Sequence, residues 1–252
     1  MHIYFLSKGG VYVAITEKKR KLITRTLSAL IITAVILPSY FLDDGSYLYW
    51  DLRFGFLMAL IEFATVICNS RFVPLHSDEY AVTTFVLVEL LACLFCSDQL
   101  SVELIGGCIF VCVVTDVFAY LMGTFCGGTL IKKRPFPKIS PNKSYEGLIF
   151  GISCGIIGAY VWTLFLRNAD TPVPFWRFAI VAPLAVFGDL LESRFKRLYD
   201  VKDANDFIID VPILGWLEKP LGGRDGHGGY LDRLDSLAIA LLAQLALELL
   251  FL

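Results

Sequence analysis

Residues 104–122 read LIGGCIFVCVVTDVFAYLM, a run of 19 residues in which Asp116 is the single charged side chain. An α-helix of about 20 apolar residues crosses the ~30 Å hydrocarbon core of a bilayer. Six other windows approach this length and apolarity: 22–41, 54–68, 80–96, 148–166, 173–191 and 234–251. Only helices or closed barrels satisfy all backbone hydrogen bonds in lipid. The windows lack the alternation of apolar and polar residues that is typical of barrel strands. The chain is therefore predicted to be an all-α, polytopic transmembrane bundle of about seven helices.

The composition excludes several other classes of protein. Of 252 residues, 56% are hydrophobic and 18% charged, whereas soluble domains average ~45–50% and ~25%. The net charge is −2, so no basic excess points to nucleic acid, which is excluded as a partner. Most of the seven cysteines lie inside apolar windows, where they pack as small apolar residues, and no disulfide is expected. No cleaved signal peptide is expected either.

Basic residues predict the orientation in the membrane, because lysine and arginine accumulate in cytoplasmic loops. Most of the 22 lie in three clusters, at 18–25, 132–143 and 194–233. Four predicted spans separate the first two clusters and two separate the last two, so all three can share one face. We expect an inside N-terminus, an outside C-terminus and cytoplasmic loops at 123–147 and 192–233. The predicted division is 1–122, N-terminal spans, and 123–252, a catalytic membrane region; the apolar stretch 3–15 could add a shallow or re-entrant segment.

The first of these loops carries groups that suit a phosphate ligand. Three prolines between 135 and 141 disfavour helix, so the segment is predicted to be a stiff, extended loop. It would present Ser140, Lys143 and Ser144 at the membrane surface. The alternative is a loop that binds no ligand and is basic only because cytoplasmic loops are rich in lysine and arginine. Asp116, with Tyr120 one turn on, is a second candidate, because a carboxylate inside a span is costly to ionise; the alternative is a hydrogen-bonded structural pair.

Two helix ends bring further charged groups to the same surface. If the sixth helix continues past residue 191, Asp189, Ser193, Lys196 and Arg197 share one face. At the start of the last helix, Asp232, Asp235 and Ser236 also share a face, where the helix dipole favours anions.

Carboxylates beside lysines suggest a metal that binds a phosphorylated substrate. Mg²⁺ is usually held by one or two carboxylates plus substrate phosphates. Gly228 and Gly229 would let backbone N–H groups approach phosphate oxygens, and His227 could donate to a phosphate or hold this glycine loop. The alternative for Asp232 and Arg233 is a simple ion pair beside the membrane.

These residues resemble the phosphatidate cytidylyltransferase, or CDP-diacylglycerol synthase, family. The family signature has Ser, two residues, Lys-Arg, four residues and Lys-Asp, and later His-Gly-Gly, two residues, Asp-Arg, one residue and Asp. The matching positions are Ser193, Lys196, Arg197, Lys202, Asp203, His227, Gly228, Gly229, Asp232, Arg233 and Asp235. The loop at 139–147, ISPNKSYEG, is similar to a further element of the family. The likeness is strong in the C-terminal half and mainly one of hydropathy in the N-terminal half.

The resemblance implies transfer of a cytidylyl group from CTP to phosphatidate at a Mg²⁺ site, with K⁺ as a second cation described for the family. The catalytic residues that follow are Asp189, Lys202, Asp203, His227, Asp232, Arg233 and Asp235. The substrate-binding residues are Ser140, Lys143, Ser144, Ser193, Lys196, Arg197, Gly228 and Gly229. The metal ligands are Asp189, Asp232 and Asp235. The expected partners are CTP, phosphatidate and the bilayer, with a homodimer left open, and the expected location is a bacterial plasma membrane with the site facing the cytoplasm.

One feature departs from the family pattern. In bacterial members the gap between Lys-Asp and His-Gly-Gly is about seven residues, whereas here 23 residues separate Asp203 from His227. The added stretch at 207–226 is typical of an amphipathic or re-entrant piece, with Trp216 as an interfacial anchor.

Two other functions compete with this interpretation. A CTP-dependent polyprenol or diacylglycerol kinase would move the γ-phosphoryl group instead of the cytidylyl group. A transporter would spread ionisable residues through the membrane depth. Here nearly all of them are predicted to lie at the inside surface of the membrane, with Asp116 and Glu62 as exceptions.

Overall fold

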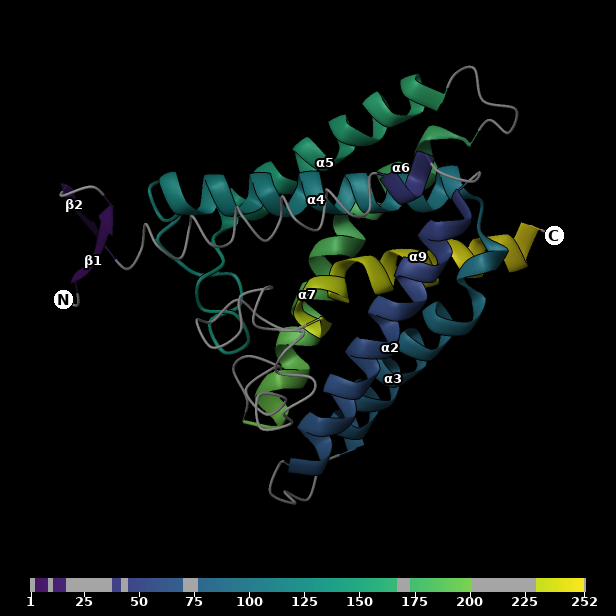
Figure 1. Ribbon diagram of the computed structural model, residues 1–252, viewed down its shortest axis with the longest axis horizontal. Helices are drawn as coiled ribbons and strands as arrows, with labels where there is room; N and C mark the ends of the chain where they lie inside the picture. Colours follow the sequence, from purple (N-terminus) through teal and green to yellow (C-terminus); the bar gives the residue numbers. More distant parts are fainter. Residues whose placement is uncertain are drawn as a thin grey trace.

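The computed structural model describes residues 3–8, 11–16, 38–41, 45–69, 77–166, 173–200 and 230–251. Within them, long helices dominate the architecture (Figure 1). The elements are β1 (Ile3–Lys8), β2 (Val11–Thr16), α2 (Ser46–Asn69), α3 (Ser77–Cys96), the short 3₁₀ helix η2 (Ser97–Gln99), α4 (Val102–Phe125), α5 (Tyr145–Phe165), α6 (Phe175–Ala179), α7 (Val181–Leu198) and α9 (Leu231–Phe251).

The predicted helices are found where the apolar windows lie. Three segments of the described chain are long and apolar enough to cross a membrane: Glu79–Gln99, Val102–Phe125 and Tyr145–Phe165. The helices α2 and α9 match the windows at 54–68 and 234–251. Of the window at 22–41, the structure describes only residues 38–41, which are helical. The helical membrane-type fold is thus confirmed, while the number of spans stays a prediction.

The predicted span at 173–191 is divided into α6 and α7. The break falls at Ile180, between Ala179 and Val181. Pro183 explains the break, because proline has no N–H with which to bond the carbonyl of Ala179, and its ring crowds that carbonyl. Beyond the break, α7 continues to Leu198, as the shared-face argument required.

The apolar stretch at the N-terminus forms a β-hairpin. Strands β1 and β2 pair antiparallel, from Ile3 opposite Thr16 to Lys8 opposite Val11. Gly9 and Gly10 separate the two strands in sequence, and Gly-Gly is typical of two-residue hairpin loops. The hairpin stands apart from the helices (Figure 1). The all-α prediction did not include these strands.

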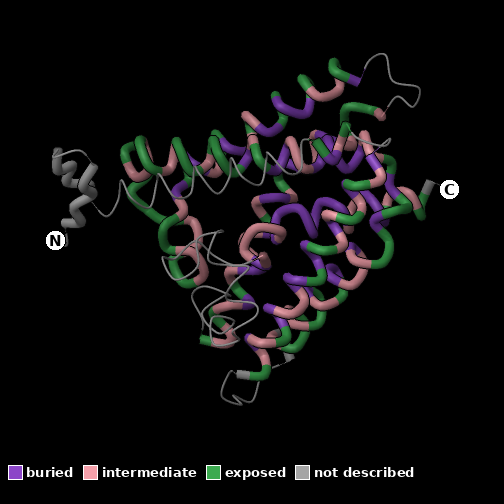
Figure 2. The backbone as a smooth tube through the Cα atoms, in the orientation of Figure 1, coloured by how far each residue is buried: buried purple, intermediate pink, exposed green. Residues whose placement is uncertain are grey.

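The buried core lies where the helices cross, and the outer faces are exposed (Figure 2). Helices α4 and α5 pack closely because α5 presents Gly147, Gly151 and Gly155 along one face. A Cβ at Gly151 would approach Ala119 and Thr115 of α4. The opposite face of α5 exposes large apolar side chains, such as Ile149 and Ile157 at 62% each. This combination of small residues inside and apolar residues outside is typical of helices packed in a membrane.

A second glycine brings α7 against α9. A Cβ at Gly188 would lie 2.5 Å from the carbonyl oxygen of Asp235, closer than van der Waals contact allows. The helices can therefore approach backbone to backbone only because this residue has no side chain. The approach places Asp189, the next residue of α7, beside the first turns of α9.

The far half of α9 is bound to α6 by a partly buried polar network. Arg177 Nε donates to Gln244 Oε1 at 2.9 Å, and its Nη1 pairs with Glu248 Oε1 at 2.8 Å. In return, Gln244 Nε2 donates to the carbonyl of Arg177 at 2.8 Å. Gln244 is fully buried, so these bonds satisfy polar groups that would otherwise be costly to bury.

Candidate active site

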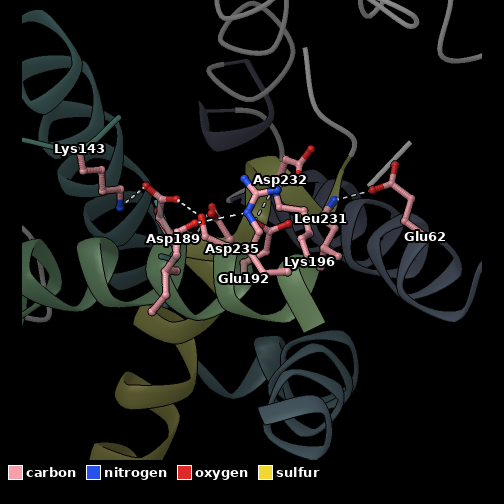
Figure 3. Close-up of polar contacts among 12 residues, drawn as sticks. Glu62, Lys143, Asp189, Glu192, Lys196, Leu231, Asp232 and Asp235 are labelled. Carbon is pink, nitrogen blue, oxygen red and sulfur yellow. Dashed lines mark hydrogen bonds and ion pairs between the residues drawn. The ribbon is translucent and has the colours of Figure 1, made fainter. Parts of the chain in front are cut away.

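Charged residues from four parts of the chain meet where α7 passes the start of α9 (Figure 3). Lys143, from the loop before α5, pairs with Asp189 of α7, with 2.5 Å between Nζ and Oδ2. The Oγ of Ser193, one turn further along α7, donates to Asp189 Oδ1 at 3.4 Å. The predicted loop therefore reaches the predicted carboxylate, and α7 places Ser193 on the same face.

Lys196 joins the two helices. Its Nζ lies 2.8 Å from Glu192 Oε2 on α7 and 2.5 Å from Asp232 Oδ1 on α9. Burial opposes the charged form of Lys196, but the carboxylates of Glu192 and Asp232 outweigh it and raise the pKa of the lysine above its usual range. The ammonium group is therefore positively charged at neutral pH and bridges two acidic side chains.

Acidic groups outnumber the lysines in this cluster. Asp116 of α4, Asp189 of α7 and Asp235 of α9 lie within electrostatic reach of one another. Asp235 is 8% exposed, and its Oδ1 accepts the backbone N–H of Ser236 at 2.6 Å. With Glu192 and Asp232, five carboxyl groups from three helices face two lysines, Lys143 and Lys196. We call these seven residues the acidic cluster.

The acidic cluster fits a divalent cation by charge. Glu192 lies past the predicted span, and burial, helped by the neighbouring Asp232 carboxylate, raises its pKa well above the usual value. Its Oε1 is buried without a hydrogen-bond partner in the described structure, and a bound cation would satisfy this oxygen and favour the ionised form of the carboxyl group. Among the described residues, however, no three His, Cys, Asp or Glu side chains are placed as a ready-made ligand set. The lysines hold two of the predicted ligands instead.

The remaining predicted residues take different positions. Ser144 is 2% exposed, and its Oγ accepts the N–H of Gly147 at 3.2 Å, which caps α5. Arg197 is exposed and its Nε donates to the carbonyl of Ile139 in the loop at 3.4 Å. Ser140 is half-buried in that loop. Arg233 lies in the first turn of α9, within electrostatic reach of Asp232. Substrate binding by these residues stays a prediction.

Five predicted site residues lie outside the described part of the chain, as does the whole added stretch at 207–226 with Trp216. They are Lys202, Asp203, His227, Gly228 and Gly229.

Two acidic residues of the region were not assigned to the site from the sequence. Glu192 comes three residues after Asp189 and four before Lys196, so helical spacing alone could have placed it on the same face. Glu62 of α2 is fully buried and accepts the N–H groups of Tyr230 and Leu231 at 2.8 and 2.7 Å. No local pattern indicates this contact, because it joins distant segments of the chain.

Comparison with known proteins identifies the family to which this chain belongs. Residues 3–210 match the model of the Cytidylyltransferase family, so the chain belongs to that family. The match includes Asp189 and Lys196 and ends before the motif at 227–235.

Three curated relatives share one name. The phosphatidate cytidylyltransferase of Bacillus subtilis is 31% identical over 252 residues, which cover 93% of this chain and 82% of that protein. The phosphatidate cytidylyltransferase of Helicobacter pylori strain 26695 is 35% identical over 143 residues, 56% of this chain and 47% of that protein. That of Haemophilus influenzae is 36% identical over 121 residues, 46% and 36% respectively. The chain thus spans most of the Bacillus relative but less than half the length of the other two.

Proposed function

We propose that this protein transfers the cytidylyl group of CTP to phosphatidate, forming CDP-diacylglycerol and pyrophosphate. The observation that carries the proposal is the acidic cluster, in which carboxylates of α4, α7 and α9 meet lysines of α7 and of the loop before α5. Family membership and the shared name of the relatives support it.

The reaction exchanges one phosphorus–oxygen bond for another. A phosphate oxygen of phosphatidate attacks the α-phosphorus of CTP, the bond to the bridging α–β oxygen breaks, and pyrophosphate leaves with that electron pair. Such a transfer is catalysed mostly by positioning and by neutralising charge on phosphate oxygens. Both requirements suit a cluster that combines carboxylates with ammonium groups.

The residues of the acidic cluster divide between these tasks. Asp189, Asp232 and Asp235 would hold Mg²⁺, with K⁺ as a second cation near them. The bound Mg²⁺ would neutralise charge on the triphosphate. Lys143 and Lys196 are the described cations closest to these carboxylates, so we assign them to the phosphates of the substrates. Arg197 and Arg233, which lie outside the acidic cluster, would also bind substrate phosphate.

We further propose that the chain crosses a bacterial plasma membrane about seven times, with the acidic cluster at the cytoplasmic face. Three membrane-capable helices and the exposed apolar face of α5 support membrane insertion. The basic loop at 132–143 lies next to the cluster through Lys143, and basic loops are typical of the cytoplasmic side. The named relatives are bacterial proteins.

A labelling experiment tests the reaction directly. Purified protein in detergent is incubated with phosphatidate, Mg²⁺ and CTP labelled at either the α- or the γ-phosphorus. Cytidylyl transfer puts only the α-label into lipid and the γ-label into pyrophosphate. Lipid labelled from the γ-position would instead show a kinase and overturn the proposal.

Lys143→Met is expected to raise the KM for CTP or phosphatidate roughly tenfold or more, because a hydrogen bond to a charged group contributes about 1.5–3 kcal/mol. The melting temperature in detergent should change little, since partly exposed ion pairs contribute only about 0–1 kcal/mol. Lys138→Met is the matched control, because Lys138 is an exposed lysine of the same loop. Equal KM values for the two variants would remove Lys143 from the substrate site.

A further inference from the structure

We infer that Glu62 is a positioning residue of the reaction: from α2, its carboxylate caps the first turn of α9 and so fixes the positions of Asp232 and Asp235. Glu62 Oε1 accepts the N–H of Tyr230 at 2.8 Å, and Oε2 accepts the N–H of Leu231 at 2.7 Å. Figure 3 shows Glu62 on the side of the cluster opposite Lys143. The inference rests on the proposed function.

The cap supplies what the start of α9 lacks. The first N–H groups of a helix have no partner within the helix and are usually satisfied by a Ser, Thr, Asp or Asn side chain just before it. Here Tyr230 occupies that position and has no such group. The Glu62 carboxylate, from another helix, accepts the N–H of Tyr230, just before α9, and that of Leu231, its first residue, where the helix dipole also favours negative charge.

The environment of Glu62 indicates that the contact is strong. Glu62 is 0% exposed, and a buried carboxylate is costly unless it is hydrogen-bonded or paired with a cation. Two short bonds from backbone N–H groups meet this requirement, and Arg233 lies within electrostatic reach. The carboxylate and the helix start therefore stabilise each other.

Other contacts make α2 a support for both helices of the acidic cluster. The ring of Phe54 meets that of Tyr230 edge to face, with 6.2 Å between centroids. The ring of Phe63 stacks on that of Phe195 of α7 at 4.9 Å. Glu62 lies next to Phe63 in sequence and contacts the residue just before Asp232. A shift of its carboxylate would thus move the Asp232 carboxylate relative to α7.

The test compares Glu62→Gln and Glu62→Ala with Glu89→Gln. Gln keeps the size of Glu62 but offers one oxygen acceptor, so one N–H of α9 would face an amide N–H. Glu89, a buried glutamate of the neighbouring helix α3 at 3% exposure, controls for the replacement of a buried carboxyl group by an amide. The first readout is backbone hydrogen exchange in the peptide that spans residues 230–236, which needs no activity.

We expect faster exchange in this peptide for Glu62→Ala, a smaller increase for Glu62→Gln and no change for Glu89→Gln. In Glu62→Gln, the Mg²⁺ concentration for half-maximal turnover should rise roughly 10–100-fold, the usual effect of losing a group that orients a metal ligand. The KM for CTP at saturating Mg²⁺ should stay unchanged, which separates positioning from a general loss of structure.

The outcomes are distinguishable. Unchanged exchange and unchanged Mg²⁺ dependence in the Glu62 variants, with an active wild type, would overturn the inference alone. Equal effects of Glu89→Gln and Glu62→Gln would overturn it too, because any buried carboxylate would then serve. A wild-type protein without cytidylyl transfer would overturn the proposed function, and with it the catalytic meaning of the cap.

Discussion

Asp232→Asn is expected to lower the turnover number by at least about 10²–10³-fold, the loss typical of removing one electrostatic stabiliser of a transition state. Asn keeps the shape of the side chain but removes the charge that a divalent cation requires. The substitution also leaves Lys196 with Glu192 as its remaining described carboxylate partner, since Asp232 now accepts from Lys196 at 2.5 Å. The measurement is steady-state turnover with CTP and phosphatidate in detergent.

The control for this variant is Asp200→Asn. Asp200 is exposed just after α7 and has a φ of 55°, a backbone conformation that Asn also tolerates. The Asp200→Asn substitution removes a carboxylate that is close in sequence to the acidic cluster but is not part of it. Turnover and melting temperature should equal those of the wild type. If Asp232→Asn were as active as this control, Asp232 would not belong to the metal site.

Removal of divalent cations with EDTA is expected to stop the reaction, and Mg²⁺ added in excess is expected to restore it. The physical reason is that five carboxyl groups face two lysines in the acidic cluster, and a divalent cation would favour the ionised form of these groups and offset the charge of the triphosphate. Without a cation, the triphosphate of CTP would meet repulsion from these carboxylates. The measurement is pyrophosphate release across a Mg²⁺ titration.

A second readout of Mg²⁺ binding does not depend on turnover. A ligand that binds the folded state stabilises it by about 2.7 kcal/mol at 100 times its Kd. Mg²⁺ should therefore raise the melting temperature of the wild type and have a smaller effect on Asp232→Asn. Turnover that persists in EDTA would contradict the metal-assisted scheme as a whole.

The sequence predicts the helices well because their signal is local. Continuous apolarity over 104–122 lies within α4 (Val102–Phe125). Spacing of four residues predicted that Asp189 and Ser193 share a face, and the two side chains are hydrogen-bonded. The hairpin at 3–16 was not predicted because a short apolar run does not separate strand from membrane helix by periodicity.

The contacts between distant segments could not be predicted in the same way. Glu62 and Tyr230 are 168 positions apart, and helical periodicity places a residue on a face without identifying the partner of that face. The pairing of Lys143 with Asp189 is of the same kind. The family resemblance did identify both residues as parts of one site, but it did not show that they contact each other.

The attachment of α9 at both ends has a consequence for how substrates enter and leave. Glu62 anchors its beginning, and Arg177 anchors Gln244 and Glu248 near its end. A helix held in this way acts as a fixed wall. We therefore expect substrates to enter and leave without displacement of α9, the helix that carries Asp232 and Asp235.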